Sequence, residues 1–317
     1  WCKSRGWWRA ASSCRIRAAE AQVGDKRTRM LALTANAQSE DREAALDALS
    51  AAFEALGRRC VTVRRMNGHL TLGGVPVEGD SIRFRSGSLE QEAEAGIRVG
   101  NLAVRGDVVA RLRRERILLI NVIPLEDYLA AVLGAEMPVT FPEEALKAQA
   151  VAARTYALKK KLEAYSADYH LGSSVLHQVY GGLQHEDPRT HQAVQATQGE
   201  VLTFGLEPIE AYFHASCGGR TESGLAALGR DLPYLQPVDC PCGDLPSAQW
   251  SLTLPLSELG AAVGEDDATS FDVVSRTSTG RAQSVRMGRG QTIDAVALRK
   301  GLGYSRLKSL SFKVDRT

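Results

Sequence analysis

The carboxylate best placed to do chemistry is Glu136, which stands between a glycine and a Met-Pro pair in Gly134-Ala-Glu-Met-Pro138. The glycine predicts the end of one helix, and the proline predicts a break before the next. We therefore expect Glu136 at a bend between packed helices, where a side chain can point into a cleft and act as a general acid or base. The residue pattern alone leaves a second interpretation open, a helix-capping or surface glutamate.

A second group with site chemistry lies further along the chain, in His214-x-x-Cys217 and Cys240-x-Cys242. One imidazole and three thiols are ligands that suit a tetrahedral zinc ion. Cys-x-Cys is not the common spacing of a zinc knuckle, so cysteines without a ligand role remain an alternative.

An alanine-rich helix is expected after the bend, from Pro142 to Lys161, and its composition indicates close packing on several sides. Lys147 and Arg154 share one face of this helix. Gln149 belongs to the same helix. A basic residue among alanines needs a carboxylate or carbonyl partner. We expect Arg154 either to pair with a structural acid or to orient Glu136, whereas a solvated surface position is the main alternative for Lys147.

Other polar residues have weaker patterns. The candidate second carboxylates all occupy first turns of predicted helices, where negative charge is favoured in any case: Glu126, Asp127, Glu143 and Glu144. Two tyrosines have rings that can stack on sugars, with core or rim packing as the alternative: Tyr128 and Tyr212. Four histidines show no spacing that makes a site: His170, His177, His185 and His191.

The elements that must position these residues predict an α+β fold, with short strands packed around a central pair of helices and a second β-rich subdomain. Helical periodicity and its stop signals predict helices at 39–58, 124–134, 142–161 and 188–196. Alternating patterns predict short strands between 61 and 123, a strand pair at 201–203 and 209–213, and a hairpin over 275–286.

Composition limits the classes of function. The 317 residues include 39 basic and 37 acidic side chains, a net charge of +2, which gives no support to nucleic-acid binding. The sequence contains no stretch of 18 or more apolar residues, so it predicts no transmembrane helix. The basic N-terminal segment lacks a continuous apolar region, so no secretory signal is visible in it. Six cysteines are too few for a disulfide scaffold of this length.

Three blocks of sequence resemble one family. They are NVIPLEDYLAAVLGAEMPVTFPEEALKAQAVAARTYAL at 121–158, AYFHASCGGRTES at 211–223 with LPYLQPVDC after it, and the weaker pair TSTGRAQSVRM and ALRKGLG near the end. Together these blocks, which span about residues 60–315, are similar to the SpoIID/LytB family, the stage II sporulation protein D and amidase-enhancer domains.

The resemblance implies a lytic transglycosylase that cleaves the MurNAc-GlcNAc glycan strands of peptidoglycan to 1,6-anhydro products. In this family one glutamate, at the position of Glu136, serves as both acid and base, and no cofactor is required. The alternative that the resemblance leaves open is a non-catalytic amidase enhancer that binds glycan or an N-acetylmuramoyl-L-alanine amidase. Residues carried over as substrate-binding candidates are Lys147, Gln149, Arg154, Tyr212, Gly218 and Gly219.

The resemblance also implies an exported protein of the cell envelope or periplasm. In that setting a disulfide between Cys217 and either Cys240 or Cys242 is as plausible as zinc, since only a subset of the family is thought to bind metal here.

We expect residues 1–38 to be unstructured or wrongly assigned and 39–317 to form the family domain, with a helix and β-rich part at 39–123 and a catalytic core at 124–317. Relatives continue into a GHGVGMSQ-type stretch near the active site. The sequence does not reach such a stretch, so we expect the core to be incomplete at its C-terminal end.

Overall fold

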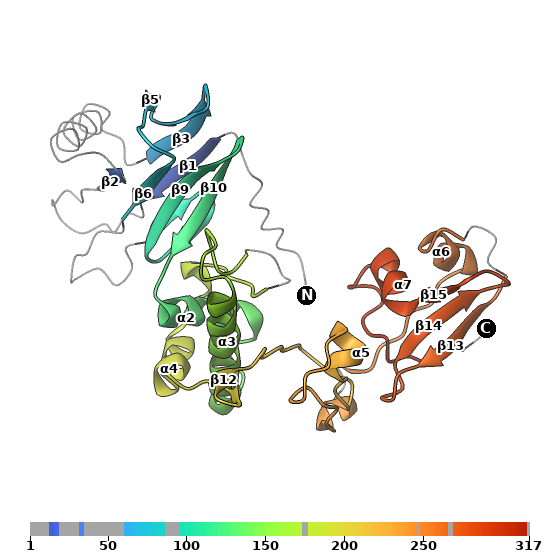
Figure 1. The fold of residues 1–317 in the computed structure, drawn as a ribbon. Coiled ribbons are helices and arrows are strands. Elements are labelled where there is room, and N and C mark those ends of the chain that lie inside the picture. The colour runs from blue at the N-terminus through green and yellow to red at the C-terminus, as the bar shows by residue number, and fades with distance from the viewer. Residues whose placement is uncertain are drawn as a thin grey trace. The chain divides into compact units, whose positions relative to one another are not determined.

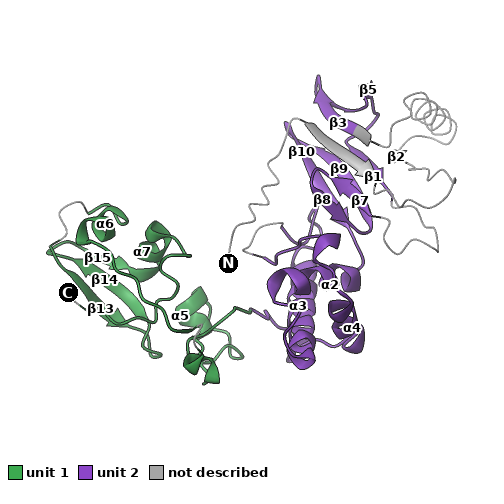
Figure 2. Cartoon of the chain, turned by 180° about the vertical axis from the view of Figure 1, so that it is seen from behind, with its two compact units in different colours: residues 1–4, 213–317 green, residues 5–212 purple. Residues whose placement is uncertain are grey.

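A computed structural model describes residues 60–85, 96–172, 177–245, 248–265 and 269–315, together with strands at 13–18 and 32–34. The described residues up to Tyr212 form one compact unit, and the described residues from Phe213 onward form the other (Figure 2). We call these the N-terminal and the C-terminal unit. The boundary between Tyr212 and Phe213 lies inside the stretch 124–317, which we expected to be one catalytic core.

Two antiparallel sheets make up the first half of the N-terminal unit. The first has the order β5-β4-β3-β1-β7-β8: β1 (Ser13–Ala18), β3 (Cys60–Met66), β4 (His69–Leu72), β5 (Val75–Pro76), β7 (Ile97–Val99) and β8 (Leu102–Val104). The second has the order β10-β9-β6-β2: β2 (Ala32–Thr34), β6 (Ser81–Phe84), β9 (Asp107–Arg113) and β10 (Arg116–Val122).

Period-two alternation explains how these sheets share one core. In β6, Ile82 and Phe84 are buried while Ser81 and Arg83 are half-buried. The apolar faces of both sheets meet in a single cluster, with Val63 and Leu70 among its fully buried members. The segment 1–38, which we expected to be unstructured, contributes β1 and β2 to these sheets, and the predicted helix at 39–58 lies outside the described residues.

Three helices pack against one another in the second half of this unit (Figure 1). They are α2 (Leu125–Glu136), α3 (Glu143–Glu163) and α4 (Pro188–Ala196), and a short 3₁₀ turn, η1 (Leu183–His185), packs on α2. α4 begins with a capping box in which the Asp187 side chain accepts from the Arg189 N–H. The central helix pair and α4 agree with the sequence prediction.

Ion pairs connect the sheets to the helical half. Glu186, next to η1, accepts a bidentate pair of hydrogen bonds from Arg105 at the β8–β9 turn, from Nε to Oε1 at 2.9 Å and from Nη2 to Oε2 at 2.7 Å. Asp168, after α3, accepts from Arg111 and Arg113 of β9 at 2.5–2.7 Å. These arginines hold the pKa of the Asp168 carboxyl well below its usual range.

The C-terminal unit has its own core. A three-stranded antiparallel sheet, β13 (Phe271–Arg276), β14 (Ala282–Met287) and β15 (Thr292–Asp294), packs against α7 (Ala295–Leu302). Smaller elements precede it: α5 (Gly224–Leu228), η2 (Pro241–Asp244) and α6 (Leu256–Ala261). The predicted hairpin over 275–286 is therefore present, and with both units taken together the fold class is α+β.

The strand pair predicted at 201–203 and 209–213 is shorter than expected. The hairpin consists of β11 (Thr203–Phe204) and β12 (Glu207–Pro208), and residues 209–213 form no strand. Leu206 supplies a positive φ of 68° at its turn. The segment after Pro208 instead lies against α3 through its side chains, which explains its apolar alternation without sheet pairing.

Candidate active site

Glu136 is the last residue of α2, since the helix continues through Gly134 and Met137 is its C-cap before Pro138. The expectation that Gly134 ends the helix is thus wrong. A Cβ at Gly134 would lie 1.9 Å from the carbonyl oxygen of His185, so the glycine allows η1 to pack directly on α2. The break that follows Glu136 still places this residue at the bend between α2 and α3.

The Glu136 carboxyl is half-buried and accepts a hydrogen bond of 2.6 Å from the backbone N–H of Val179. Burial raises the pKa of this carboxyl, and the Val179 N–H offsets part of the rise because it stabilises the charged form. A carboxyl with a raised pKa and one firm donor is the kind of group that can give up a proton and take it back.

The donor belongs to a segment, residues 177–182, that crosses α2 and α3; we call it the crossing segment. Its Gln178 side chain is 1% exposed and donates to the carbonyl of Ala153 in α3 at 3.1 Å. The same amide accepts from the Tyr128 hydroxyl of α2 at 2.9 Å. Tyr180 stacks on Tyr128 with ring centroids 5.3 Å apart. Tyr128 therefore packs in the site wall instead of presenting an open ring to a sugar.

Arg154 has a structural partner and does not contact Glu136. Its side chain is 2% exposed and forms a bidentate pair with Glu126 of α2, at 3.0 and 2.7 Å. It also donates to the carbonyls of Val194 and Glu200 at 3.1 and 3.2 Å. This guanidinium is buried and its donors are engaged within the chain, which favours the structural of the two roles expected for Arg154 and gives no support to a substrate contact.

Lys147 lies at the surface of α3 and pairs with Glu143 at 2.7 Å and Glu144 at 2.9 Å. These pairs raise the pKa of the Lys147 ammonium and lower that of the Glu143 carboxyl. Three of the four candidate second carboxylates are therefore engaged in ion pairs. Gln149 is half-buried, and its amide nitrogen is buried with no hydrogen-bond partner among the described residues, which leaves a donor for a ligand.

Tyr212 lies at the end of the N-terminal unit and is 41% exposed. Its hydroxyl donates to the buried carboxylate of Glu210, and its ring makes an edge contact with Tyr156 of α3, centroids 5.9 Å apart. The side chain is fixed on α3 while part of its ring stays open to solvent.

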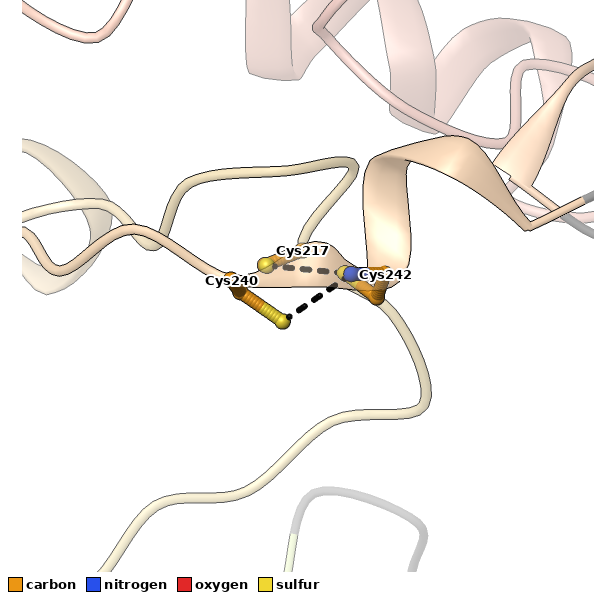
Figure 3. Close-up of side chains that lie close together, drawn as sticks. All are labelled: Cys217, Cys240 and Cys242. Atoms are coloured by element: carbon orange, nitrogen blue, oxygen red, sulfur yellow. Dashed lines mark hydrogen bonds between the residues drawn. The ribbon is translucent and has the colours of Figure 1, made fainter.

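The C-terminal unit brings together three of the four predicted metal-binding residues. The sulfurs of Cys217, Cys240 and Cys242 all lie within 4.8 Å of one another, and Figure 3 shows the three side chains converging. His214 is exposed and does not join this group. The Cys217 and Cys242 sulfurs are 3.1 Å apart, and all three cysteines are free thiols.

Close backbone packing forms the cysteine site. Gly218 and Gly219 have φ of 72° and 108°, and a Cβ at Gly243 would lie 2.9 Å from the Gly219 Cα. This confirms the expected turn of close backbone approach. Burial raises the pKa of the Cys217 thiol to about 11, and hydrogen bonds from Cys217 and Cys240 lower that of Cys242 to about 6.

The third sequence block, TSTGRAQSVRM, holds the cysteine loop. Arg281 of its hairpin donates to the Cys217 carbonyl at 2.5 Å and the Arg220 carbonyl at 2.6 Å. Glu222 accepts from the hydroxyls of Thr277 and Thr279, and these bonds help to lower the pKa of its carboxyl. The block therefore has a structural role within the C-terminal unit.

The residues that sequence reasoning missed are those of the crossing segment, above all Gln178 and Val179. The string Gln178-Val-Tyr-Gly-Gly182 carried the signal, because a Gly-Gly pair after an aromatic indicates close backbone approach. Gly182 has a φ of 68°, and a Cβ there would lie 2.1 Å from the Ala103 carbonyl of β8. The sequence alone predicts no site here, because the residues that this string contacts lie far along the chain in α2 and α3.

Comparison with known proteins relates the sequence around this site to one family. The family model for stage II sporulation protein matches residues 113–204, which contain Glu136, α3 and the crossing segment. The stage II sporulation protein D of Bacillus subtilis is 31% identical over 212 residues, 61% of each chain. Over the residues that they cover, these matches support a member of the SpoIID/LytB family.

Two further relatives extend this picture. An uncharacterized protein of Brachyspira hyodysenteriae is 29% identical over 231 residues, 71% of this chain and 62% of that protein. The amidase enhancer of Bacillus subtilis is 33% identical over 150 residues, 47% of this chain and 19% of that protein. The chain spans about three-fifths of the length of the first two relatives.

Proposed function

We propose that this SpoIID/LytB chain is a lytic transglycosylase that cleaves peptidoglycan glycan strands, with Glu136 as its one acid–base residue. The observation that supports this most is the half-buried Glu136 carboxyl, whose pKa is raised by burial and which a backbone N–H orients. Ordinary glycosidases use two carboxylates. Here Glu126, Glu143 and Glu144 are held by Arg154 and Lys147, which favours a mechanism with one.

In the proposed reaction, protonated Glu136 gives its proton to the glycosidic oxygen, and the bond from that oxygen to the anomeric carbon of the muramic acid breaks. The 6-hydroxyl of the same sugar then attacks the anomeric carbon and returns its proton to the Glu136 carboxylate. The products are a free hydroxyl on the leaving glucosamine and a 1,6-anhydro ring. No water is consumed, and the enzyme ends with the proton it began with.

Glu136→Gln tests this assignment, because the amide keeps the shape and still accepts from Val179 but cannot exchange a proton. We expect loss of 1,6-anhydro muropeptides, measured by mass spectrometry of digested cell wall, with glycan binding unchanged. Glu144→Gln is the matched control, since that side chain is 83% exposed. Anhydro products released by Glu136→Gln at the parent rate would exclude Glu136 as the acid.

The amidase-enhancer relative supports a second function, in which the chain binds glycan or an N-acetylmuramoyl-L-alanine amidase without cutting. Stimulation of a purified amidase by Glu136→Gln and by the parent chain to the same extent would favour this function. The relatives' names also support action at the cell envelope, outside the cytoplasm. No described helix is long and apolar enough to cross a membrane.

We also propose that Cys217, Cys240 and Cys242 hold a zinc ion. Three sulfurs within 4.8 Å of one another are a donor set that zinc accepts, and His214 is not required. Zinc bound there would hold the loop that carries Gly218 and Gly219.

The zinc proposal predicts about one zinc per chain by elemental analysis, loss of that zinc in Cys242→Ser, and its retention in His214→Ala. If the chain as purified contains no zinc, and thiol counting after denaturation shows a disulfide between Cys217 and Cys240 or Cys242, the disulfide alternative is favoured instead.

A further inference from the structure

The crossing segment places a backbone N–H against Glu136, and the Gln178 side chain anchors this segment to the helices. The N–H that bonds Glu136 belongs to the peptide unit that joins Gln178 to Val179. The orientation of that peptide unit therefore follows the position of Gln178 directly.

Gln178 is held from two helices at once. Its Nε2 donates to the Ala153 carbonyl of α3, and its Oε1 accepts from the Tyr128 hydroxyl of α2. The side chain is 1% exposed, so neither bond has water as a ready substitute. A buried amide with a donor and an acceptor both engaged fixes its own backbone as well as its side chain.

We propose that Gln178 is a positioning residue for the acid–base glutamate, which aims the Val179 N–H at Glu136 by anchoring the crossing segment to α2 and α3. This inference rests on the proposed function only for its effect on catalysis. Tyr180 supports the same segment on the other side of Val179 by its stacking on Tyr128.

The role differs from a general contribution to folding, because the Val179 N–H favours the charged form of Glu136. When Gln178 no longer aims this donor, the pKa of the Glu136 carboxyl should rise further. After the first proton transfer, the carboxylate should also be oriented less well toward the 6-hydroxyl.

The titration of Glu136 has to be distinguished from the titrations of other groups near it. Tyr128 on α2 interacts electrostatically with Glu136, and Tyr180 of the crossing segment and Tyr156 of α3 interact with Tyr128 in turn; burial raises the pKa of all three phenols above the usual value. Two imidazoles belong to the adjoining stretch of the same chain: His177 starts the crossing segment, and the backbone of His185 packs on Gly134.

The experiment uses Gln178→Met in the full chain, which keeps the length of the side chain and removes both hydrogen bonds. Carboxyl ¹³C NMR of labelled glutamates follows the Glu136 titration directly, with Glu136→Gln giving the assignment, so the imidazoles and phenols do not interfere. Cell-wall digestion gives kcat, KM and the pH profile of the same variants. Gln195→Ala, on the exposed face of α4, is the control.

We expect Gln178→Met to raise the pKa of Glu136, move the matching limb of the pH profile to higher pH and lower kcat about tenfold, with KM little changed. Tyr128→Phe removes one of the two bonds and keeps the ring stack, so it should shift the same quantities in the same direction by less. It also keeps the test decisive if Gln178→Met does not fold.

An unchanged Glu136 titration in folded Gln178→Met or Tyr128→Phe would overturn the positioning role. If Glu136→Gln retains full activity, the proposed catalytic function fails, while the NMR titration still decides whether Gln178 positions the carboxyl.

Discussion

Glu136 combines partial burial with a backbone donor, and its charge state is therefore linked to folding. Its raised pKa means that the folded chain binds this proton more tightly than the unfolded chain does. Ionisation of Glu136 above the unfolded pKa of about 4.3 thus lowers stability, and the whole penalty is present once the pH exceeds the folded pKa.

Glu136→Gln removes this penalty and keeps the acceptor for Val179. We expect its melting temperature at pH 7 to exceed that of the parent by up to about 3 °C, with the difference vanishing below about pH 4. Thermal melts across that pH range measure this. A variant less stable than the parent at pH 7 would show that the Val179 bond outweighs burial.

For individual residues, the sequence predicts the position of Glu136 but not that of its hydrogen-bond donor. The position of Glu136 before Met137-Pro138 is visible in a short string, and the structure keeps it at the bend. The donor from Val179 is 43 residues away, and no periodicity relates the two positions. Local patterns can therefore locate an acid, but the group that tunes its pKa depends on tertiary packing.

At the scale of elements, Arg154 joins three helices through one buried side chain. It pairs with Glu126 of α2 from its place on α3, and donates to the carbonyl of Val194 on α4. Removal of one partner from a buried pair leaves the other charge uncompensated. The first-turn position of Glu126 indicated only a favourable charge at a helix start, because its partner is 28 residues away.

Arg154→Ala should destabilise the N-terminal unit by about 2–5 kcal/mol, since it leaves a cavity between helices and removes the donors of Glu126 and of the Val194 carbonyl. Chemical denaturation measures the loss. Lys147→Ala is the control on the same helix, because its ion pairs with Glu143 and Glu144 lie at the surface and should leave stability nearly unchanged. Equal losses in the two variants would contradict the structural role of Arg154.

Elements with strong local signals were predicted well. α3 was expected over 142–161 and is found at Glu143–Glu163, and the hairpin at β13–β14 turns where Thr279-Gly280 predicts. Gly134 shows the limit. A glycine late in a helix is an ordinary stop signal, yet here it serves the approach of η1 and the helix continues for two more residues. A glycine late in a helix can either end the helix or allow another segment to pack closely, and the tertiary packing decides which of the two occurs.

At the scale of the whole molecule, the chain consists of two units that each bury their own core. The proposed acid and its donor both belong to the N-terminal unit, and the cysteine site belongs to the C-terminal unit. The predicted boundary at residue 124 followed the change from strands to helices. That change lies inside the N-terminal unit because Arg105–Glu186 and the Asp168 pairs tie its two halves together.

Separate cores predict separate responses to core substitutions. Leu298 of α7 is 1% exposed in the C-terminal core, and Leu129 of α2 is fully buried between the helices of the N-terminal unit. Each change to alanine should cost about 2–5 kcal/mol in its own unit, through lost apolar contacts and the cavity left behind. Hydrogen exchange measured by mass spectrometry should show faster exchange in β14 and α7 for Leu298→Ala, with α2 and α3 protected as in the parent. Leu129→Ala should give the reverse pattern. Loss of protection throughout the chain in either variant would contradict this division, since it would mean that the two cores unfold as one.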